Sequence, residues 1–300
     1  HVSKSRLIFL FFLFVSFFVN SQDNTPFVVY DFDKDPDYKM RMLTLKKLEK
    51  RSPSIKTFIA IASLSYYYKD WETAISFYEK IIIENPSAEY YFKLGVSAAR
   101  KSLEVSRFFS VPYLVKAKRS VLKAHRMAPK NPKYLKLLIK LFAEIPTILG
   151  GNKEFAKKKV DELYIIDPIQ GLILEGYLND IDKYSSAAKS KYELAFDLLE
   201  NKYQSYENFF EENDRDLIFE IGSVVANHEM LSNLGIAALK FYANTYDFMD
   251  NYPLATAYYH LSRIYFSHQD LNSSSEYLAK SLKLNPKFQI ALDFQKKHQL

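Results

Sequence analysis

Residues 67–86, YYKDWETAISFYEKIIIENP, contain the pattern that decides the fold. Ala74 is followed four residues later by Tyr78, then three later by Ile81 and five later by Pro86. Steps of four and three keep side chains on one face of an α-helix, and a proline after the last turn ends the helix. A small residue there lets a second helix approach closely, and the aromatic ring fills the space beside it. The stretch therefore predicts a helix that packs tightly on a neighbour.

The same spacing recurs along the chain, which indicates an internal repeat. Three further segments end in proline, and a fourth has glutamate at that place: Ala117, Val121, Ala124, Pro129; Ala156, Val160, Leu163, Pro168; Ser274, Leu278, Ser281, Pro286; and Ala188, Tyr192, Ala195, Glu200.

Small residues also precede several of these helices, where a partner helix is expected. Ala62, Gly176 and Ser262 lie twelve positions before Ala74, Ala188 and Ser274, with the short polar turns Lys69-Asp70, Asp182-Lys183 and Gln269-Asp270 between. Gly95 precedes Ala117 by 22 positions, so this unit has about ten extra residues around Ser106–Pro112. The sequence therefore predicts consecutive pairs of antiparallel helices.

The first and last units, Thr57–Pro86 and Ala257–Pro286, resemble tetratricopeptide repeats, in which a helix–turn–helix recurs about every 34 residues. The resemblance is carried by residues 67–86 and by YFSHQDLNSSSEYLAKSLKLNP at 265–286. Between them the units are longer and more divergent. The resemblance implies an all-α superhelix, or solenoid, of helix pairs, with about 13 to 15 helices and no strand.

These patterns divide the chain into a leader and one helical repeat domain. We expect a signal peptide at 1–21, an extended leader at 22–36 and the repeat domain at 37–300, which opens with a helix at 37–51. The clearest repeats are expected at 54–86 and 255–286, the degenerate repeats at 88–129, 131–168, 169–200 and 215–249, and a capping helix at 286–298.

The N-terminal residues have the three-part layout of a signal peptide. Lys4 and Arg6 precede an apolar stretch at residues 7–19, LIFLFFLFVSFFV, and small residues then precede Gln22. The stretch is too short to span a bilayer, which needs about 20 apolar residues. We expect cleavage before Gln22 and export, to the periplasm or out of the cell. The alternatives are a membrane-anchored first helix or a buried core helix.

The composition excludes several kinds of chemistry. There is no cysteine, so disulfides, thiolate catalysis and cysteine-bound zinc are absent. Only 7 glycines occur in 300 residues, which leaves little room for glycine-rich ligand loops. The six histidines do not cluster, and His228-Glu229 lacks the second histidine of a zinc protease motif. We therefore expect no enzyme activity, no metal and no cofactor.

One loop permits two interpretations. Gly150-Gly151-Asn152-Lys153 at a helix start could form an anion-binding nest. It could equally be a glycine-dependent turn with Asn152 as the N-cap of the next helix, and the sequence favours this second interpretation.

The predicted function is binding of a protein or peptide partner. In a right-handed superhelix the first helix of each pair lines the concave side. Groove residues are expected one face away from the packing positions, and many are of types common at interfaces. They are Ser63, Tyr66, Tyr67, Phe92, Arg100, Tyr177, Tyr259, Arg263 and Phe266. The alternative is that about half of them belong to the core.

We do not expect this groove to hold a set of asparagine side chains that binds the C-terminal carboxylate of a peptide. Some tetratricopeptide repeats hold a C-terminal carboxylate with asparagines, and Ser63, Val96, Tyr177 and Arg263 stand at the corresponding positions.

A second, weaker resemblance gives an alternative function. The segment from Pro146 to Gly151 is similar to a loop in exported bacterial repeat proteins, including the T-component lipoproteins of TRAP transporters. That resemblance implies a small-ligand-binding or accessory component of an envelope transport system. This chain lacks the cysteine that carries the lipid in those proteins.

Charge is unevenly distributed. Residues 100–159 hold sixteen basic and three acidic side chains, whereas residues 160–300 hold twelve basic and 21 acidic ones. Lys116, Arg119 and Lys123 lie three and four apart, so we expect them to share a helix face that meets an anionic partner or envelope surface. A solvated face, or pairing with the acidic half of a neighbouring copy, is the alternative. Nucleic acid is not expected because the chain is predicted to be exported. The sequence specifies neither the partner nor the oligomeric state.

Overall fold

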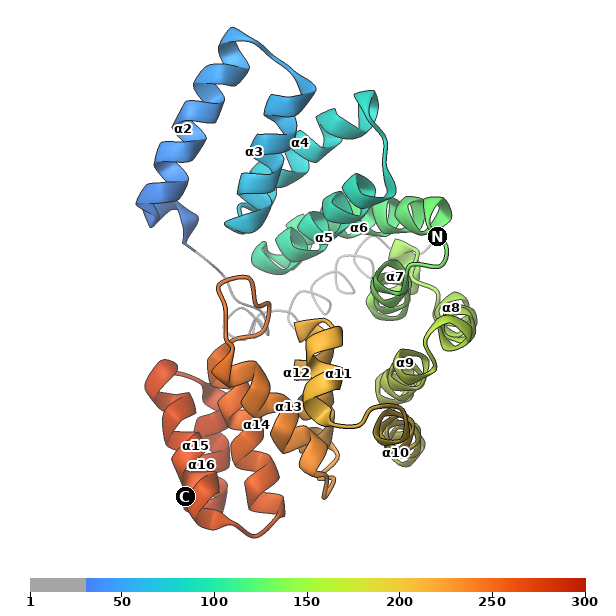
Figure 1. Ribbon diagram of the computed structural model, residues 1–300, viewed down its shortest axis with the longest axis vertical. Helices are drawn as coiled ribbons and strands as arrows, with labels where there is room; N and C mark the ends of the chain where they lie inside the picture. Colours follow the sequence, from blue (N-terminus) through green and yellow to red (C-terminus); the bar gives the residue numbers. More distant parts are fainter. Residues whose placement is uncertain (1–30) are drawn as a thin grey trace, which may run out of the picture. The chain divides into compact units, whose positions relative to one another are not determined.

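The structure is a computed structural model that describes residues 31–300 (Figure 1). Over this range it has 15 α-helices, two short 3-10 helices and no strand. The prediction of an all-α repeat fold is therefore confirmed. The predicted signal peptide and most of the predicted leader lie outside the described residues. In the described part of the chain, no helix combines the length and hydropathy needed to cross a bilayer.

The described chain divides into two compact units. The first holds the described residues up to Asn85 together with Lys93–Arg119, and the second holds Pro86–Phe92 and Ser120–Leu300. The elements up to α6 are η1 (Phe32–Lys34), α2 (Pro36–Arg51), α3 (Ile55–Tyr67), α4 (Trp71–Glu84), α5 (Ala88–Glu104) and α6 (Arg107–Met127). The remaining elements are α7 (Pro132–Glu144), η2 (Thr147–Leu149), α8 (Lys153–Ile166), α9 (Pro168–Ile181), α10 (Ser185–Lys202), α11 (Tyr206–Glu212), α12 (Arg215–Asn227), α13 (Asn233–Asn244), α14 (Leu254–Ser267), α15 (Leu271–Leu284) and α16 (Gln289–His298).

The small residues at the helix contacts are buried as the spacing predicts. Ala62 of α3 and Ala74 of α4 are fully buried. In the last pair, Ser274 of α15 donates a hydrogen bond to the carbonyl of Ser262 in α14 over 2.9 Å. Between α9 and α10, a Cβ added at Gly176 would lie 2.5 Å from the ring of Tyr192. The helices of a pair therefore approach as closely as their small residues allow.

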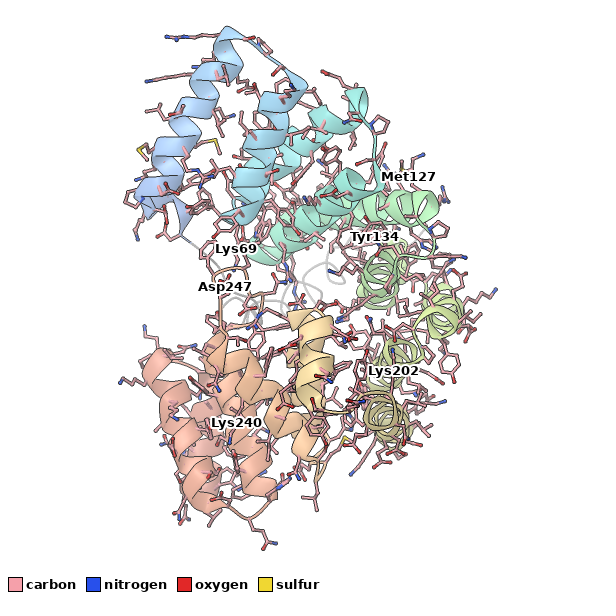
Figure 2. All side chains as sticks on the ribbon, in the orientation of Figure 1. Lys69, Met127, Tyr134, Lys202, Lys240 and Asp247 are labelled. Atoms are coloured by element: carbon pink, nitrogen blue, oxygen red, sulfur yellow. The ribbon has the colours of Figure 1, made fainter. Side chains whose placement is uncertain are left out.

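The turn inside four pairs has one conformation. Lys69, Lys183, Glu229 and Gln269 end the first helix with positive φ values of 61°, 65°, 50° and 63°. The next residue donates its N–H to the carbonyl five positions earlier, as Asp270 does to Tyr265 over 3.0 Å. This is the Schellman arrangement, here built without glycine. It turns the chain sharply and lets Asp70 and Asp270 cap the second helix in two of the pairs. Figure 2 labels Lys69 at the first of these turns.

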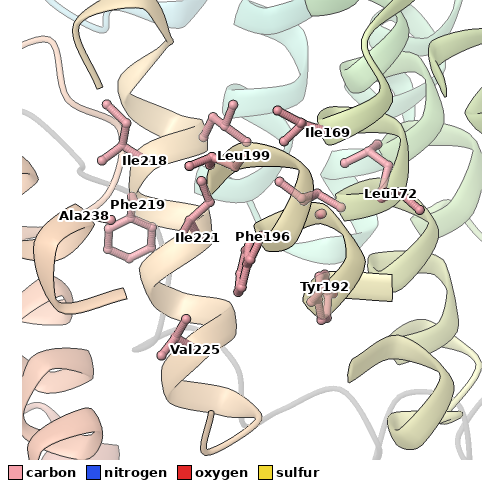
Figure 3. Packing of buried hydrophobic residues seen from close by; sticks show 14 of the residues in the cluster. Ile169, Leu172, Tyr192, Phe196, Leu199, Ile218, Phe219, Ile221, Val225 and Ala238 are labelled. Atoms are coloured by element: carbon pink, nitrogen blue, oxygen red, sulfur yellow. The ribbon is translucent and has the colours of Figure 1, made fainter. Parts of the chain in front are cut away.

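The second unit has a continuous apolar core. It draws on every helix from α7 to α14, and Figure 3 shows its central part, where α9, α10, α12 and α13 contribute side chains. Gly222 and Gly235 let α12 and α13 meet, since a Cβ at either would lie within 2.5 Å of Leu239 or Val225. The weaker repeat predicted at 215–249 thus packs through glycines rather than alanines.

Several elements differ from the sequence expectation. Phe32–Lys34 form a 3-10 helix at the end of the leader, which had been expected to be extended. The extra residues near Ser106–Pro112 lengthen α5 and α6, and Pro112 lies inside α6. The short helix α11 at Tyr206–Glu212 lies between the repeats predicted at 169–200 and 215–249 and belongs to neither of them. The following Asp214 caps α12 by accepting a hydrogen bond from the N–H of Leu217 over 2.9 Å.

Candidate functional site

The first helices of the pairs in the second unit, α7, α9, α12 and α14, present a strip of polar side chains. In each of these helices one buried residue faces the partner helix: Ile139, Gly176, Gly222 and Ser262. The residue that follows it belongs to the strip: Lys140, Tyr177, Ser223 and Arg263. Neighbouring polar residues on the same helices complete the strip. We call this set, with Lys136, Glu144, Glu220 and Asn227, the polar strip.

A buried ion cluster joins α7 to α12 at one end of the polar strip. Lys140 Nζ lies 2.6 Å from Glu220 Oε1, and Lys136 Nζ lies 3.1 Å from Glu220 Oε2. Burial alone would raise the pKa of Glu220, but the charges of the two lysines outweigh it and lower this pKa to about 2. Burial alone would lower the pKa of Lys136, but Glu220 and Asp214 raise it. Glu220 and Lys136 therefore stay charged over the physiological range.

Two tyrosines extend this cluster. The hydroxyl of Tyr177 donates a hydrogen bond to Glu144, and Lys140 Nζ lies 5.4 Å from the centroid of the Tyr177 ring. Burial and the adjacent Glu144 raise the pKa of Tyr177. The hydroxyl of Tyr252 donates to Glu220 Oε1 over 3.0 Å. Tyr177 is therefore held by two charged groups of α7 and is not a freely rotating anchor.

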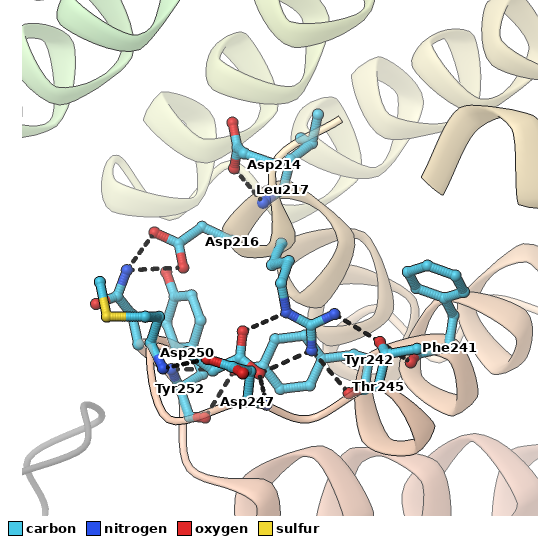
Figure 4. Close-up of polar contacts among 12 residues, drawn as sticks. Asp214, Asp216, Leu217, Phe241, Tyr242, Thr245, Asp247, Asp250 and Tyr252 are labelled. Carbon is cyan, nitrogen blue, oxygen red and sulfur yellow. Dashed lines mark hydrogen bonds and ion pairs between the residues drawn. The ribbon is translucent and has the colours of Figure 1, made fainter. Parts of the chain in front are cut away.

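The loop that carries Tyr252 is fixed by a separate network (Figure 4). The guanidinium of Arg215 binds both carboxylate oxygens of Asp250, and it also donates to Thr245 Oγ1 at 2.6 Å and to the carbonyl of Tyr242 at 2.9 Å. The Tyr252 ring stacks on Phe219 with centroids 4.1 Å apart. The loop between α13 and α14 is thus tied to α12, which keeps the Tyr252 hydroxyl on the ion cluster.

The other end of the polar strip is more accessible. Arg263 of α14 donates to Asn227 Oδ1 of α12 over 2.6 Å, and its guanidinium lies 5.8 Å from the Tyr259 ring centroid. Behind them, His260 is buried within 3.3 Å of the hydroxyl of Ser223. Burial, together with the charge of Arg263, lowers the pKa of His260 to about 3, so this imidazole is neutral. Asn227 is exposed. Its Oδ1 accepts from Arg263 and its Nδ2 donates to Ser223 Oγ over 3.4 Å, which leaves one lone pair and one N–H of the amide for a partner.

One comparison with solved structures agrees with this architecture. A tetratricopeptide repeat protein from Parabacteroides merdae superposes with a TM-score of 0.52, at 9% identity, over 89% of this chain and 94% of that one. This chain has the tetratricopeptide repeat fold. MamA aligns over 58% of this chain and 98% of its own, with 17% identity and a TM-score of 0.44. The C-terminal part of a repeat protein from Cytophaga hutchinsonii aligns over 86% and 94%, with 14% identity and a TM-score of 0.42. No protein-family model and no curated protein matches the sequence.

Within this tetratricopeptide fold, the structure divides the predicted groove residues of the last repeat. Arg263 lies on the polar strip. Tyr259 is only 7% exposed, because α16 covers it with Phe288 and Phe294 at centroid distances of 5.4 and 5.9 Å. Phe266 packs on Phe294 and on His298. The expectation that Tyr259 lines a groove is therefore corrected, because the capping helix covers its ring. Phe266 packs on the same helix but is only half-buried, so its place in a groove stays a prediction.

Near the start of the second unit, Phe92 belongs to a contact between helices. Its ring lies 4.6 Å from the ring of Tyr134 in α7. It is half-buried, and this contact accounts for its apolar character.

The first unit places its predicted groove residues differently. Ser63 and Tyr67 are exposed and border an open groove of about 720 Å³ between α2 and α3. Tyr66 instead packs edge-on against Trp71 and Tyr78, with centroids 5.6 and 6.2 Å away, so it belongs to the α3–α4 contact. Arg100 of α5 is half-buried. The groove is lined by Met40, Arg41, Thr44, Leu45, Ala60, Ser63, Leu64 and Tyr67.

The predicted basic face of α6 is only partly available. Arg119 and Lys123 are exposed, whereas Lys116 is half-buried and lies 2.6 Å from Glu79 Oε1 of α4. Lys116 therefore already has an acidic partner within the first unit, and its assignment to an accessible anionic site is corrected.

The Gly150-Gly151 loop is a turn, and its amides are occupied. Gly150 has a φ of 86° and donates to the carbonyl of Thr147, Gly151 donates to that of Pro146, and Asn152 donates to that of Phe142. Asn152 Oδ1 then accepts from the N–H of Phe155 at 2.9 Å and caps α8. The N-cap interpretation is confirmed. In the described part of the chain, no three potential metal ligands come together.

Sequence reasoning missed Lys136, Lys140, Glu144, Glu220 and Asn227. The α7–α8 pair has a long loop, so its packing positions, Ile139 and Ala156, are seventeen residues apart rather than twelve. Ile139 is also not a small residue. Lys140 could have been found from the sequence as the residue after the packing position of its helix. Its ion-pair partner Glu220 is identified only by the folded structure.

Proposed function

We propose that this protein is a scaffold that binds an extended segment of another protein along the polar strip of its second unit. The observation that carries the proposal is the accessible Arg263–Asn227 pair, at the opposite end of the polar strip from the fixed ion cluster. An extended peptide has an unpaired N–H and C=O at each residue, and side-chain amides and guanidinium groups can bind these groups whatever the peptide sequence. Because internal contacts already hold the side chains in place, binding needs little further ordering.

Peptide selection would test this proposal. Peptides selected on the protein from a displayed random library should bind Arg263→Glu and Asn227→Ala variants at least about tenfold more weakly, as expected when a positioned polar contact is lost. Lys158→Glu is the matched control, because Lys158 is an exposed lysine on α8, a second helix of a pair. Equal Kd values for all three variants and the parent would place the binding surface elsewhere.

We further propose that the protein is exported after cleavage before Gln22, which is supported by the pattern of residues 1–21. N-terminal sequencing of the protein from fractionated cells should find Gln22 as the first residue in the periplasm or medium. An uncleaved N-terminus in the cytoplasmic fraction would exclude processing at this site.

The small-ligand alternative came from the resemblance of the loop at Pro146 to Gly151, and the groove between α2 and α3 is a place where a ligand could bind. Its volume of about 720 Å³ lies within the range of ligand pockets, roughly 300–1,000 Å³. The groove is open to solvent, however, and such a shape suits an extended segment better than an enclosed small molecule. We therefore keep peptide binding as the proposed function.

A further inference from the structure

One face of α6 is apolar at its start and basic at its end. Phe108, Pro112, Val115, Arg119, Lys123 and Arg126 follow one another at steps of three or four. Because all six belong to one continuous helix, helical geometry alone places them on one face. Ala117, Val121 and Ala124 lie on the opposite side and are fully buried. The outer face of α6 is therefore a defined stripe, which we call the α6 stripe.

The apolar end of the α6 stripe projects into solvent. Phe108 is 79% exposed and Phe109 is 64% exposed, and their rings contact each other edge-on at 5.4 Å. Leu103, at the end of α5, is also exposed. Two adjacent phenylalanines with this exposure form a protruding tip, whereas a residue that lines a groove would be enclosed. Such apolar exposure indicates an interaction surface.

The basic end of the α6 stripe consists of cations that have no acidic partner within the described residues. Arg119, Lys123 and Arg126 are exposed, and no carboxylate among residues 31–300 lies within ion-pair distance of them. By contrast, Lys116 pairs with Glu79. The sixteen basic and three acidic residues of 100–159 add a favourable field for an anion.

We propose that the α6 stripe docks the protein on a bilayer that contains anionic phospholipid. The Phe108–Phe109 tip would enter the boundary between headgroups and acyl chains, which accepts an apolar protrusion without a matching pocket. Arg119, Lys123 and Arg126 would lie along the headgroup phosphates, each adding about 1 kcal/mol, or roughly fivefold in partitioning. This role goes beyond peptide binding, because it uses a different surface and a different partner.

The test places a fluorescent reporter at the tip of the whole chain. A Phe108→Trp variant is mixed with vesicles of brominated phosphatidylglycerol and phosphatidylcholine, and tryptophan quenching is measured. The native Trp71 is 5% exposed and gives a constant background. Tyr184→Trp is the control, because Tyr184 is a 63% exposed aromatic residue at the start of α10. The reporter is specific to its position, so binding through apolar residues 7–19 does not imitate it.

The proposal predicts a blue shift and quenching for Phe108→Trp but not for Tyr184→Trp, with little effect on phosphatidylcholine alone. Adding Arg119→Glu, Lys123→Glu and Arg126→Glu should reduce partitioning by about 100-fold or more, and circular dichroism should be unchanged because all three residues are exposed. Equal quenching of the two reporters, or quenching that survives the triple reversal, would overturn the proposal. A third result would also overturn the proposal: the parent binds poly-glutamate but no vesicles, and the triple reversal abolishes poly-glutamate binding. That result would assign the α6 stripe to an acidic protein partner.

Discussion

Gly176 fixes the distance between α9 and α10 at the scale of a single residue. A Cβ there would lie 2.5 Å from the Tyr192 ring, which cannot turn away because its hydroxyl donates to Asp180 at 2.8 Å and its face contacts His228. Gly176→Ala should therefore lower the free energy of unfolding by about 1–3 kcal/mol through overpacking, measured by urea denaturation. In a Tyr192→Leu background the same change should cost much less. An equal cost in both backgrounds would show that the ring is not the obstacle.

Gln269 occupies a backbone conformation that suits glycine better. Its φ is 63°, and its side chain is exposed at the turn between α14 and α15. A residue with a side chain costs about 1–2 kcal/mol in this left-handed backbone conformation, and glycine removes that cost. Part of the resulting stabilisation is lost because glycine is more flexible in the unfolded chain. Gln269→Gly should raise the free energy of unfolding by about 0.5–1 kcal/mol. Ala279→Gly, at an exposed helical position of α15, should instead lower it by about 1 kcal/mol. A loss of stability in both variants would contradict the conformational argument.

At the scale of the elements, the ion cluster of Glu220 holds α7 to α12. Glu220→Gln removes the nearer carboxylate partner of the buried Lys136 and leaves it only Asp214 at 3.7 Å, which should cost about 3–5 kcal/mol. The pair Lys136→Met with Glu220→Leu replaces the cluster by apolar contacts and should restore most of that loss. Thermal and urea unfolding of the parent, the single variant and the double variant measure these differences in stability. A double variant as unstable as the single one would mean that the charges themselves are required.

The same cluster predicts an acid dependence of stability. Because the folded-state pKa of Glu220 is about 2 and its usual value is 4.5, its contribution is complete above pH 4.5 and is lost as the pH falls towards 2. The melting temperature of the parent should therefore fall over this window more steeply than that of the Lys136→Met, Glu220→Leu variant. Parallel pH profiles would show that other carboxylates cause the acid loss.

At the scale of the whole molecule, stability should be lowest in the terminal helices of the described chain. Only Tyr38 is buried in α2 and only Ala291 in α16, whereas α9 buries eight residues. A helix array behaves as a sum of repeats and of contacts between neighbours, so helices at the ends of the described array that bury few residues open first. Hydrogen exchange followed by mass spectrometry should show fast exchange in α2 and α16 and slow exchange in α9 and α12. Uniform protection along the chain would contradict this gradient.

The sequence by itself determined the helices, their pairing and their turns. The Ala74–Tyr78–Ile81 spacing, the capping Asp70 and Asp270, and the turn at Gly150 act over a few residues, so local geometry is enough to specify them. The short helix α11 was the exception, because its seven residues owe their place to Phe209 and Phe210, which are buried in the core of the second unit.

Only the tertiary structure decided which predicted groove residues are accessible. Lys140 and Glu220 meet although they are 80 residues apart, because α7 and α12 come close in the folded unit. Tyr259 resembled a groove anchor in the sequence, but α16 covers it. Helical spacing places a side chain on a face, whereas its burial and its charge partner depend on what packs against that face. Those contacts arise between helices distant in sequence, so they are fixed only when the chain folds.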